Sequence, residues 1–261
     1  MTVAATPLHS EHHRGLALKK KPSYLFASKR HVIPLCGEEF TRACHNFPIG
    51  FATYKKELVP VAITGLRKGE NLFVDSQGNW TADYKPAEVR GYPFITAIPE
   101  GEKESVLCFI NDSQHIVHAG YHAGSDILPL FQDNGQPADI MLELIDFFKH
   151  LEASRDHTRQ AMRQIADLNI LVPWKIKTRN QISNIHSLYR IDENKVENLS
   201  QEQFLALRSK TLLPLIYAHL LSTLLVSRLE QMHSSEKKDD EVQGDLFNFV
   251  NRSNDDLFKF Y

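Results

Sequence analysis

The feature that most constrains the fold is a change in the spacing of apolar residues along the chain. From residue 24 to residue 110 these residues fall in short β-type runs between turn formers, such as Val59 to Ile63, Leu72 to Val74 and Ser105 to Ile110. After residue 137 they recur every three or four positions, which is typical of helices. This order predicts an α+β fold, with a mainly antiparallel or mixed sheet in the N-terminal half packed with a helical C-terminal half.

Two long helices are predicted in the C-terminal half. The first runs from about residue 137 to residue 168 on one apolar stripe, with an interruption near Ser154. The second, from Leu212 to Met232, is so apolar that we expect it to be the most buried helix. Between them, residues 174–178 and 187–191 alternate in polarity, which predicts a hairpin that returns to the sheet.

Composition bounds the domain count and the class of partner. The 261 residues, 42% of them hydrophobic, are enough to bury a substantial core. A formal net charge of -2 lacks the basic excess that neutralises a phosphate backbone, so we expect no nucleic-acid partner. Three cysteines, Cys36, Cys44 and Cys108, are an odd number, which argues against a secreted disulfide framework.

These features predict a cytoplasmic protein without a membrane span. The N-terminal residues show no basic region followed by an apolar run and a small-residue cleavage site, as a signal peptide would. The longest apolar stretch, residues 212–229, carries Pro214, His219 and Arg228, and polar groups of this kind are costly in lipid.

The chain divides into three parts. Residues 1–18 are predicted to be a flexible leader, because they hold three histidines and small polar residues without periodicity. Residues 19–232 are predicted to form a single α+β domain. Residues 233–261 are predicted to be a disordered acidic tail, with few large aliphatic residues.

The tail contains a repeated motif. The segment Asp245-Leu-Phe-Asn-Phe249 is echoed about ten residues later by Asp256-Leu-Phe-Lys-Phe260. Paired apolar anchors of this kind would dock into a partner's pockets, with avidity from the second copy. The alternatives are a chance similarity, or a tail that folds back on its own body. The candidate docking residues are Leu246, Phe247, Phe249, Leu257, Phe258 and Phe260.

The sequence predicts neither a metal site nor a bound cofactor. Nucleophile motifs of the G-x-S-x-G, C-x-x-C and H-E-x-x-H types are missing, and so are glycine-rich phosphate loops. Histidines and cysteines gather in two places, but neither set has the spacing of a metal site. These sets are His31, Cys36, Cys44 and His45, and His115, His118 and His122.

Polar, aromatic and proline residues gather between Gly65 and Phe94, where we expect a ligand site. Flat aromatic rings would line a groove there, and polar side chains would orient a ligand. The structural alternative is that Glu70 and Asn71 cap a turn, that Arg90 pairs with Glu70, and that His219 is a satisfied core histidine. The candidate ligand-binding residues are Glu70, Asn71, Trp80, Tyr84, Arg90, Tyr92 and, nearby, His219.

Several short motifs occur in order over residues 16–232 and carry a family resemblance. They include His31-Val-Ile-Pro-Leu35, Gly69-Glu-Asn-Leu-Phe-Val74, Arg90-Gly-Tyr-Pro-Phe94 and Tyr217-Ala-His-Leu-Leu-Ser222. With them the chain resembles the SapC family of bacterial proteins. It departs from that pattern at Arg90-Gly91, where a second basic residue is common, and in its long acidic tail.

The resemblance implies a role but no catalytic residues. Family members are often encoded beside flavin-dependent halogenase-like proteins and TonB-dependent receptors, which implies an accessory role around peptides or their uptake. The family name comes from an association with bacterial surface layers. Its members have no established catalytic residues that would carry over to this chain.

Three functions follow as hypotheses. The leading one is a non-catalytic accessory protein that contacts a peptide or protein through residues 65–94, and a homo-oligomer is compatible with it. The second is an enzyme that uses Glu70, Arg90, Tyr84 and His219 for proton transfer and anchoring. The third is a surface-layer-associated component, against which the missing export signal counts.

Overall fold

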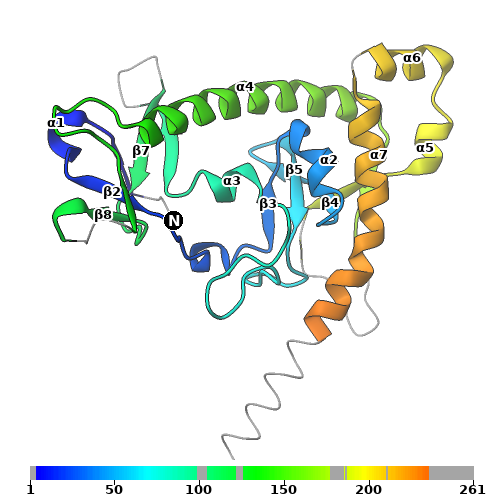
Figure 1. The fold of residues 1–261 in the computed structure, drawn as a ribbon. Helices are drawn as coiled ribbons and strands as arrows, with labels where there is room; N and C mark the ends of the chain where they lie inside the picture. The colour runs from blue at the N-terminus through cyan, green and yellow to red at the C-terminus, as the bar shows by residue number, and fades with distance from the viewer. Residues whose placement is uncertain are drawn as a thin grey trace, which may run out of the picture.

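The computed structural model describes residues 4–98, 105–121, 126–176, 185, 187–209 and 211–234. Within these residues the strands lie mostly in the N-terminal half and the helices mostly in the C-terminal half (Figure 1). Every strand pair is antiparallel. The predicted α+β class is therefore confirmed. The two Asp-Leu-Phe copies of the tail lie outside the described residues.

The largest sheet has five strands, in the order β10-β11-β4-β5-β3. A two-residue turn joins β4 to β5, and both of its residues, Lys55 and Lys56, have positive φ angles of 48° and 67°. Such a turn matches the twist of the strands and holds the hairpin in register. The strands are β3 (Val32–Pro34), β4 (Ile49–Tyr54), β5 (Glu57–Ile63), β10 (Leu171–Pro173) and β11 (Leu188–Ile191).

The predicted C-terminal hairpin forms, but its first strand is displaced. Strands β10 and β11 pair with each other, and β11 continues the sheet by pairing with β4. The first strand covers residues 171–173 instead of 174–178, because the register that aligns Leu171 with Ile191 ends at Pro173. Residues 177 and 178 lie outside the described part of the chain.

Two small sheets include the residues that we expected to be a flexible leader. One has the order β1-β7-β6 and the other the order β8-β2-β9. Leu16 and Ala17 of β2 are buried, so this segment belongs to the body of the protein. Pairing with strands about 100 residues away leaves no local signal in the sequence. The strands are β1 (Ala5–Pro7), β2 (Leu16–Lys19), β6 (Phe94–Ala97), β7 (Val106–Ile110), β8 (Ile116–His118) and β9 (Ile127–Pro129).

The segment from residue 74 to residue 80 forms a turn that is closed by a single bridge. Val74 pairs with Trp80 outside any named strand, so residues 72–74 do not form the predicted strand. Gly78 has a φ of +80°, as the turn requires, and a β-carbon there would collide with Ser23. The turn is therefore fixed by both its conformation and its close packing.

The long helix α4 (Asp139–Asp167) organises the molecule. It has no break at Ser154, contrary to the prediction, because the buried face of the helix continues through that residue from Leu151 to Thr158. The shorter helices are α1 (Ser10–His13), η1 (Leu25–Ala27), η2 (Gly37–Glu39), α2 (Phe40–Ala43), α3 (Ala87–Arg90), η3 (Ala119–Tyr121), α5 (Glu193–Glu197) and α6 (Gln201–Ser209).

Helix α4 joins two hydrophobic clusters. Phe148 and Leu151 belong to the cluster beside the small sheets, whereas Met162 and Ile165 belong to the cluster under the five-stranded sheet. Figure 1 shows the helix running from one region to the other. The turns between residues 151 and 162 therefore lie at the junction of the two clusters.

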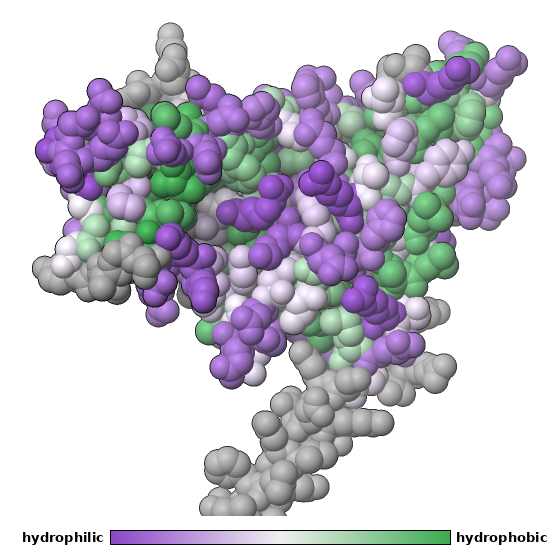
Figure 2. Space-filling model, viewed as in Figure 1, coloured by the Kyte–Doolittle hydropathy of each residue, from purple (hydrophilic) through white to green (hydrophobic). Residues whose placement is uncertain are grey.

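The apolar C-terminal segment is helical but is not the most buried helix. It comprises α7 (Leu213–Ser222), the short η4 (Thr223–Leu225) and helical residues 226–234, so it takes in the first two residues of the predicted tail. Ile216 and Leu229 face the core, but Leu221 and Leu224 are 65% and 74% exposed. Figure 2 shows hydrophobic residues at the surface along this helix. The prediction failed because composition does not reveal which face of a helix has a partner.

No single helix among the described residues passes a length and hydropathy test for a membrane span. Residues 201–208 and 213–234 pass that test only as a pair bent by 92°.

Candidate functional site

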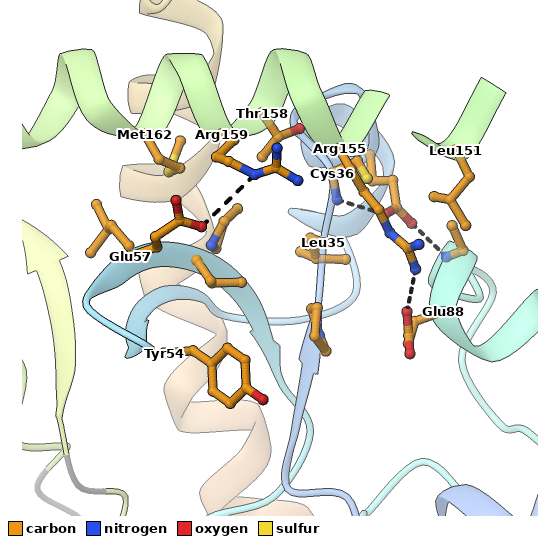
Figure 3. Close-up of a pocket in the computed structure, with 16 residues that line it drawn as sticks. Leu35, Cys36, Tyr54, Glu57, Glu88, Leu151, Arg155, Thr158, Arg159 and Met162 are labelled. Atoms are coloured by element: carbon orange, nitrogen blue, oxygen red, sulfur yellow. Dashed lines mark hydrogen bonds and ion pairs between the residues drawn. The ribbon is translucent and has the colours of Figure 1, made fainter. Parts of the chain in front are cut away.

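A pocket of about 350 Å³ opens at the junction of the two clusters. Helix α4 forms one wall, and the β4–β5 hairpin, the end of β3 and helix α3 form the others (Figure 3). These elements come from four separate parts of the sequence. The lining residues are Pro34, Leu35, Cys36, Glu39, Tyr54, Glu57, Leu58, Val59, Pro60, Ala87, Glu88, Leu151, Arg155, Thr158, Arg159 and Met162.

The floor of the pocket is mostly apolar. Leu35, Pro60 and Met162 are buried there. Tyr54 stands at the rim and is 65% exposed. Strand β3 pairs only with β5 among the described strands, and its Pro34 has no N–H group with which to pair another strand. A ligand would therefore be held by side-chain contacts more than by strand addition.

A buried carboxylate lies beside this floor. Glu39 accepts hydrogen bonds from the backbone N–H of Cys36 at 2.8 Å, the backbone N–H of Ala87 at 2.7 Å and the Tyr84 hydroxyl at 2.8 Å. These three donors satisfy the carboxylate and tie η2 to α3. Burial and the negative charge of Glu39 raise the pKa of Tyr84, so its hydroxyl keeps the proton that it donates.

The thiol in the pocket is protonated. Burial and the nearby charge of Glu39 raise the pKa of Cys36 to about 11. A thiolate is the nucleophilic form of cysteine, so Cys36 lacks the electrostatic setting of a catalytic thiol. All three cysteines are free of disulfides.

Ion pairs mark two sides of the pocket. Arg155 contacts Glu88 of α3 at 2.9 Å, and Arg159 approaches Glu57 of the hairpin at 3.8 Å. Figure 3 shows the two arginines reaching from α4 to these opposite sides. The four side chains are between 32% and 48% exposed, so each pair adds little stability. Their main effect is to place charges of both signs around an apolar floor.

Some of the predicted site residues lie next to this pocket. Arg90 lines an adjoining hollow of about 170 Å³ that shares Cys36 and Glu39 with it. The guanidinium lies 5.3 Å from the ring centre of Phe147, in a cation–π contact. Trp80 donates a hydrogen bond of 2.9 Å to the carbonyl of Tyr84, and both side chains pack against the cluster under the five-stranded sheet.

Glu70 and Asn71 lie elsewhere and cap a turn, as the structural alternative proposed. The Glu70 carboxylate accepts backbone N–H groups of Leu66 and Arg67 at 3.0 and 3.2 Å. The carboxylate also lies 2.6 Å from Nδ1 of His233, and it does not pair with Arg90 as that alternative expected. Asn71 is buried, donates to the Ala27 carbonyl and accepts from its own segment.

His219 is a satisfied core histidine. Its side chain is fully buried, its Nδ1 lies 2.8 Å from the Ile49 carbonyl, and its Nε2 accepts the backbone N–H of Ile191 at 3.0 Å. These two bonds require a neutral ring that carries its proton on Nδ1. Burial lowers the pKa of His219 to about 4. The ring therefore ties α7 to β4 and β11 and has no access to a substrate.

Tyr92 lines a separate pocket of about 340 Å³ with Lys19, Lys21 and His115. Its ring stacks on Phe26 with centroids 3.6 Å apart, and His115 meets both rings edge-on. Burial lowers the pKa of His115. The seven predicted ligand-binding residues therefore fall in four places, and the structure does not gather Glu70, Arg90, Tyr84 and His219 into one proton-transfer site.

Among the described residues, no three His, Cys, Asp or Glu side chains form a group able to hold a metal ion. His122 lies outside that part of the chain. The six candidate docking residues of the tail do so too.

Sequence reasoning missed most of the pocket. Arg155 and Arg159 are four positions apart on α4, beside an apolar stripe, and this spacing was the signal available for a charged rim. Glu39 had no signal of its own, because the second of two consecutive glutamates, Glu38 and Glu39, is ordinary at a surface. Its role depends on α3, which is distant in the sequence.

A family model described as SapC matches residues 8–229. Neither the comparison with curated proteins nor the comparison with solved structures found a match.

Proposed function

Because the chain belongs to the SapC family, we propose that it is a non-catalytic accessory protein whose pocket beneath α4 binds a peptide or a segment of a protein. One observation carries the proposal: an apolar floor lies between two ion-paired sides, and the polar groups inside are already hydrogen-bonded. A site of this kind offers contact area and orientation to a ligand.

The size and chemistry of the pocket support a peptide ligand. Its volume of about 350 Å³ is at the lower end of the range for ligand pockets, about 300 to 1,000 Å³, and suits a few apolar side chains. Each side of the pocket carries one acidic and one basic side chain, Glu88 with Arg155 on one side and Glu57 with Arg159 on the other. Charges of both signs at a rim favour a partner with complementary charges beside its apolar anchor.

The state of the polar side chains favours binding over turnover. The Cys36 thiol is protonated, and the Glu39 carboxylate accepts hydrogen bonds from three internal donors that hold it in place. A general base or nucleophile needs a free lone pair directed at the substrate. His219, the candidate acid or base of the enzyme hypothesis, is sealed in the core.

The test is a peptide selection on the full-length protein. Peptides from a random display library would be enriched on the immobilised chain and then measured by fluorescence polarisation. We expect apolar peptides with flanking charges, whose affinity falls about fivefold or more with Tyr54→Ala, since tyrosine is one of the residue types enriched among binding hot spots. Tyr217→Ala is the matched control, because Tyr217 is also an exposed tyrosine but lies on α7, outside the pocket lining.

The two variants separate the outcomes. If the selected peptides bind Tyr54→Ala as well as they bind the parent, the pocket is not the binding site. If Tyr217→Ala is the variant that weakens binding, the ligand sits on α7 and the proposal fails.

A further inference from the structure

The surface of the C-terminal helices is unusually apolar. Nine large hydrophobic side chains are exposed among the described residues, and five of them lie on α6 or on the segment 213–225. Figure 2 shows this surface along α7. Contiguous apolar surface of this kind marks a contact site more often than chance. The five are Phe204, Leu205, Tyr217, Leu221 and Leu224.

Three of these residues form a stripe that ends in a basic side chain. Tyr217, Leu221, Leu224 and Arg228 follow one another at intervals of four, three and four positions, so they share one face of the helix. Tyr217 is 50% exposed, and the two leucines are more so. Among the described residues Arg228 has no ion-pair partner. The face thus offers an apolar strip with one free positive charge at its C-terminal end.

The end of this helix is fixed in place. His233 is buried and contacts Glu70 at 2.6 Å, and Glu70 is itself bound to the turn at residues 66 and 67. The remaining 27 residues, 235–261, therefore continue from a defined point, Ser234, on the same helix that bears the stripe.

The continuing sequence has matching chemistry and spacing. Asp245 and Asp256 open the two Asp-Leu-Phe-x-Phe copies and are eleven positions apart. In a helix, residues eleven positions apart lie on nearly the same face, because eleven residues make about three turns. Tyr217 and Arg228 are also eleven positions apart. An acidic residue before each apolar pair complements a strip whose end is basic.

The length of the connecting segment permits the contact. By helix geometry, Ser234 lies about 9 Å from Arg228 and about 25 Å from Tyr217 along the axis. The ten residues 235–244 span up to about 33 Å when extended. The first copy therefore reaches Arg228 with chain to spare, and the second copy follows about 16 Å further along.

We propose that residues 245–260 pack as a helix on this stripe of their own chain, antiparallel to α7. Asp245 pairs with Arg228, the first copy covers Leu224 and Leu221, and the second copy covers Tyr217. A short linker gives the segment an effective concentration on the order of millimolar, which favours the chain's own tail over that of a second molecule. This contact is separate from the pocket beneath α4.

The test uses the full-length protein with a photo-crosslinking amino acid in place of Leu221. Protein labelled with ¹⁵N is mixed with unlabelled protein before irradiation, and the linked peptides are identified by mass spectrometry. We expect links from position 221 to residues 245–260, all within one isotopic form. The matched control carries the same group in place of Leu142, an exposed leucine on α4, and should give no link to that segment.

Charge reversal tests the proposed pairing. Arg228→Glu should reduce the yield of the link by about two- to fivefold, the range expected for an exposed ion pair, and adding Asp245→Arg should restore it. Links that join the two isotopic forms would assign the stripe to a second copy, and a complete lack of links to residues 245–260 would show another occupant. Either result overturns the proposal.

Discussion

The neutral state of His219 makes a quantitative prediction about stability and pH. Burial, helped by the positive charge of Arg190, lowers the pKa of this histidine from 6.5 to about 4. Between pH 6.5 and pH 4 this histidine is protonated in the unfolded chain but neutral in the folded protein. The contribution of His219 to stability is therefore complete above pH 6.5 and is lost as the pH falls towards 4.

The size of the effect follows from the two pKa values. Each unit of separation corresponds to about 1.4 kcal/mol, so the free energy of unfolding should fall by about 2 kcal/mol at pH 5 and about 3 kcal/mol at pH 4, relative to pH 8. Losses of this size are a large share of the stability of an ordinary domain, about 5 to 15 kcal/mol.

The assay is urea unfolding of the parent and of His219→Gln at pH 8, 6.5, 5 and 4. Glutamine is able to accept from Ile191 and donate to Ile49 but does not titrate, and the other histidines, including His31 and His115, are common to both proteins. The two stability curves should therefore diverge below pH 6.5. Parallel curves from pH 8 to pH 4 would refute the reasoning, as would an NMR titration of the His219 ring with a midpoint near 6.5.

Two further predictions concern the pocket. Glu39→Ala leaves three donors without an acceptor and should lower the free energy of unfolding by about 3 to 5 kcal/mol. Glu39→Gln keeps one acceptor oxygen and should lower it by about 1 to 3 kcal/mol. Both losses are measured as shifts of the urea midpoint, and equal losses would contradict the hydrogen-bond network. At pH 8 only about one Cys36 thiol in a thousand is ionised, so iodoacetamide should label the more exposed Cys44 first. Peptide mass spectrometry follows the labelling. Faster labelling of Cys36 would contradict its buried, protonated state.

The sequence predicted an element well where the spacing of apolar residues within that element was enough to identify it. The three-to-four spacing placed α4 within two residues of its ends, and the β-type run from Val59 to Ile63 placed most of β5. The hairpin turn of β4 was missed, because Lys55-Lys56 lacks the asparagine or glycine that usually marks such a turn. The spacing of apolar residues reports which face of an element is apolar, and this information is local.

The candidate site was much harder to foresee. The sequence singled out residues 65–94, and α3 at 87–90 does form one wall of the pocket. Glu39, Tyr54 and Arg155 were missed, since each is an ordinary polar residue until the fold brings it beside the others. The turn-capping alternative for Glu70 and the core alternative for His219 follow from residue type alone, and the observed hydrogen bonds agree with both.

The sequence by itself determined the α+β class, the long helix and the apolar character of the segment from residue 212 to residue 232. Only the tertiary structure decided that residues 16–19 join a sheet, that α4 links two clusters and that one face of α7 stays exposed. The physical reason is that the periodicity of apolar residues shows which face of an element is apolar but not which other element packs against that face. Partners are chosen by contacts between residues far apart in the chain, and the pocket is built from such contacts.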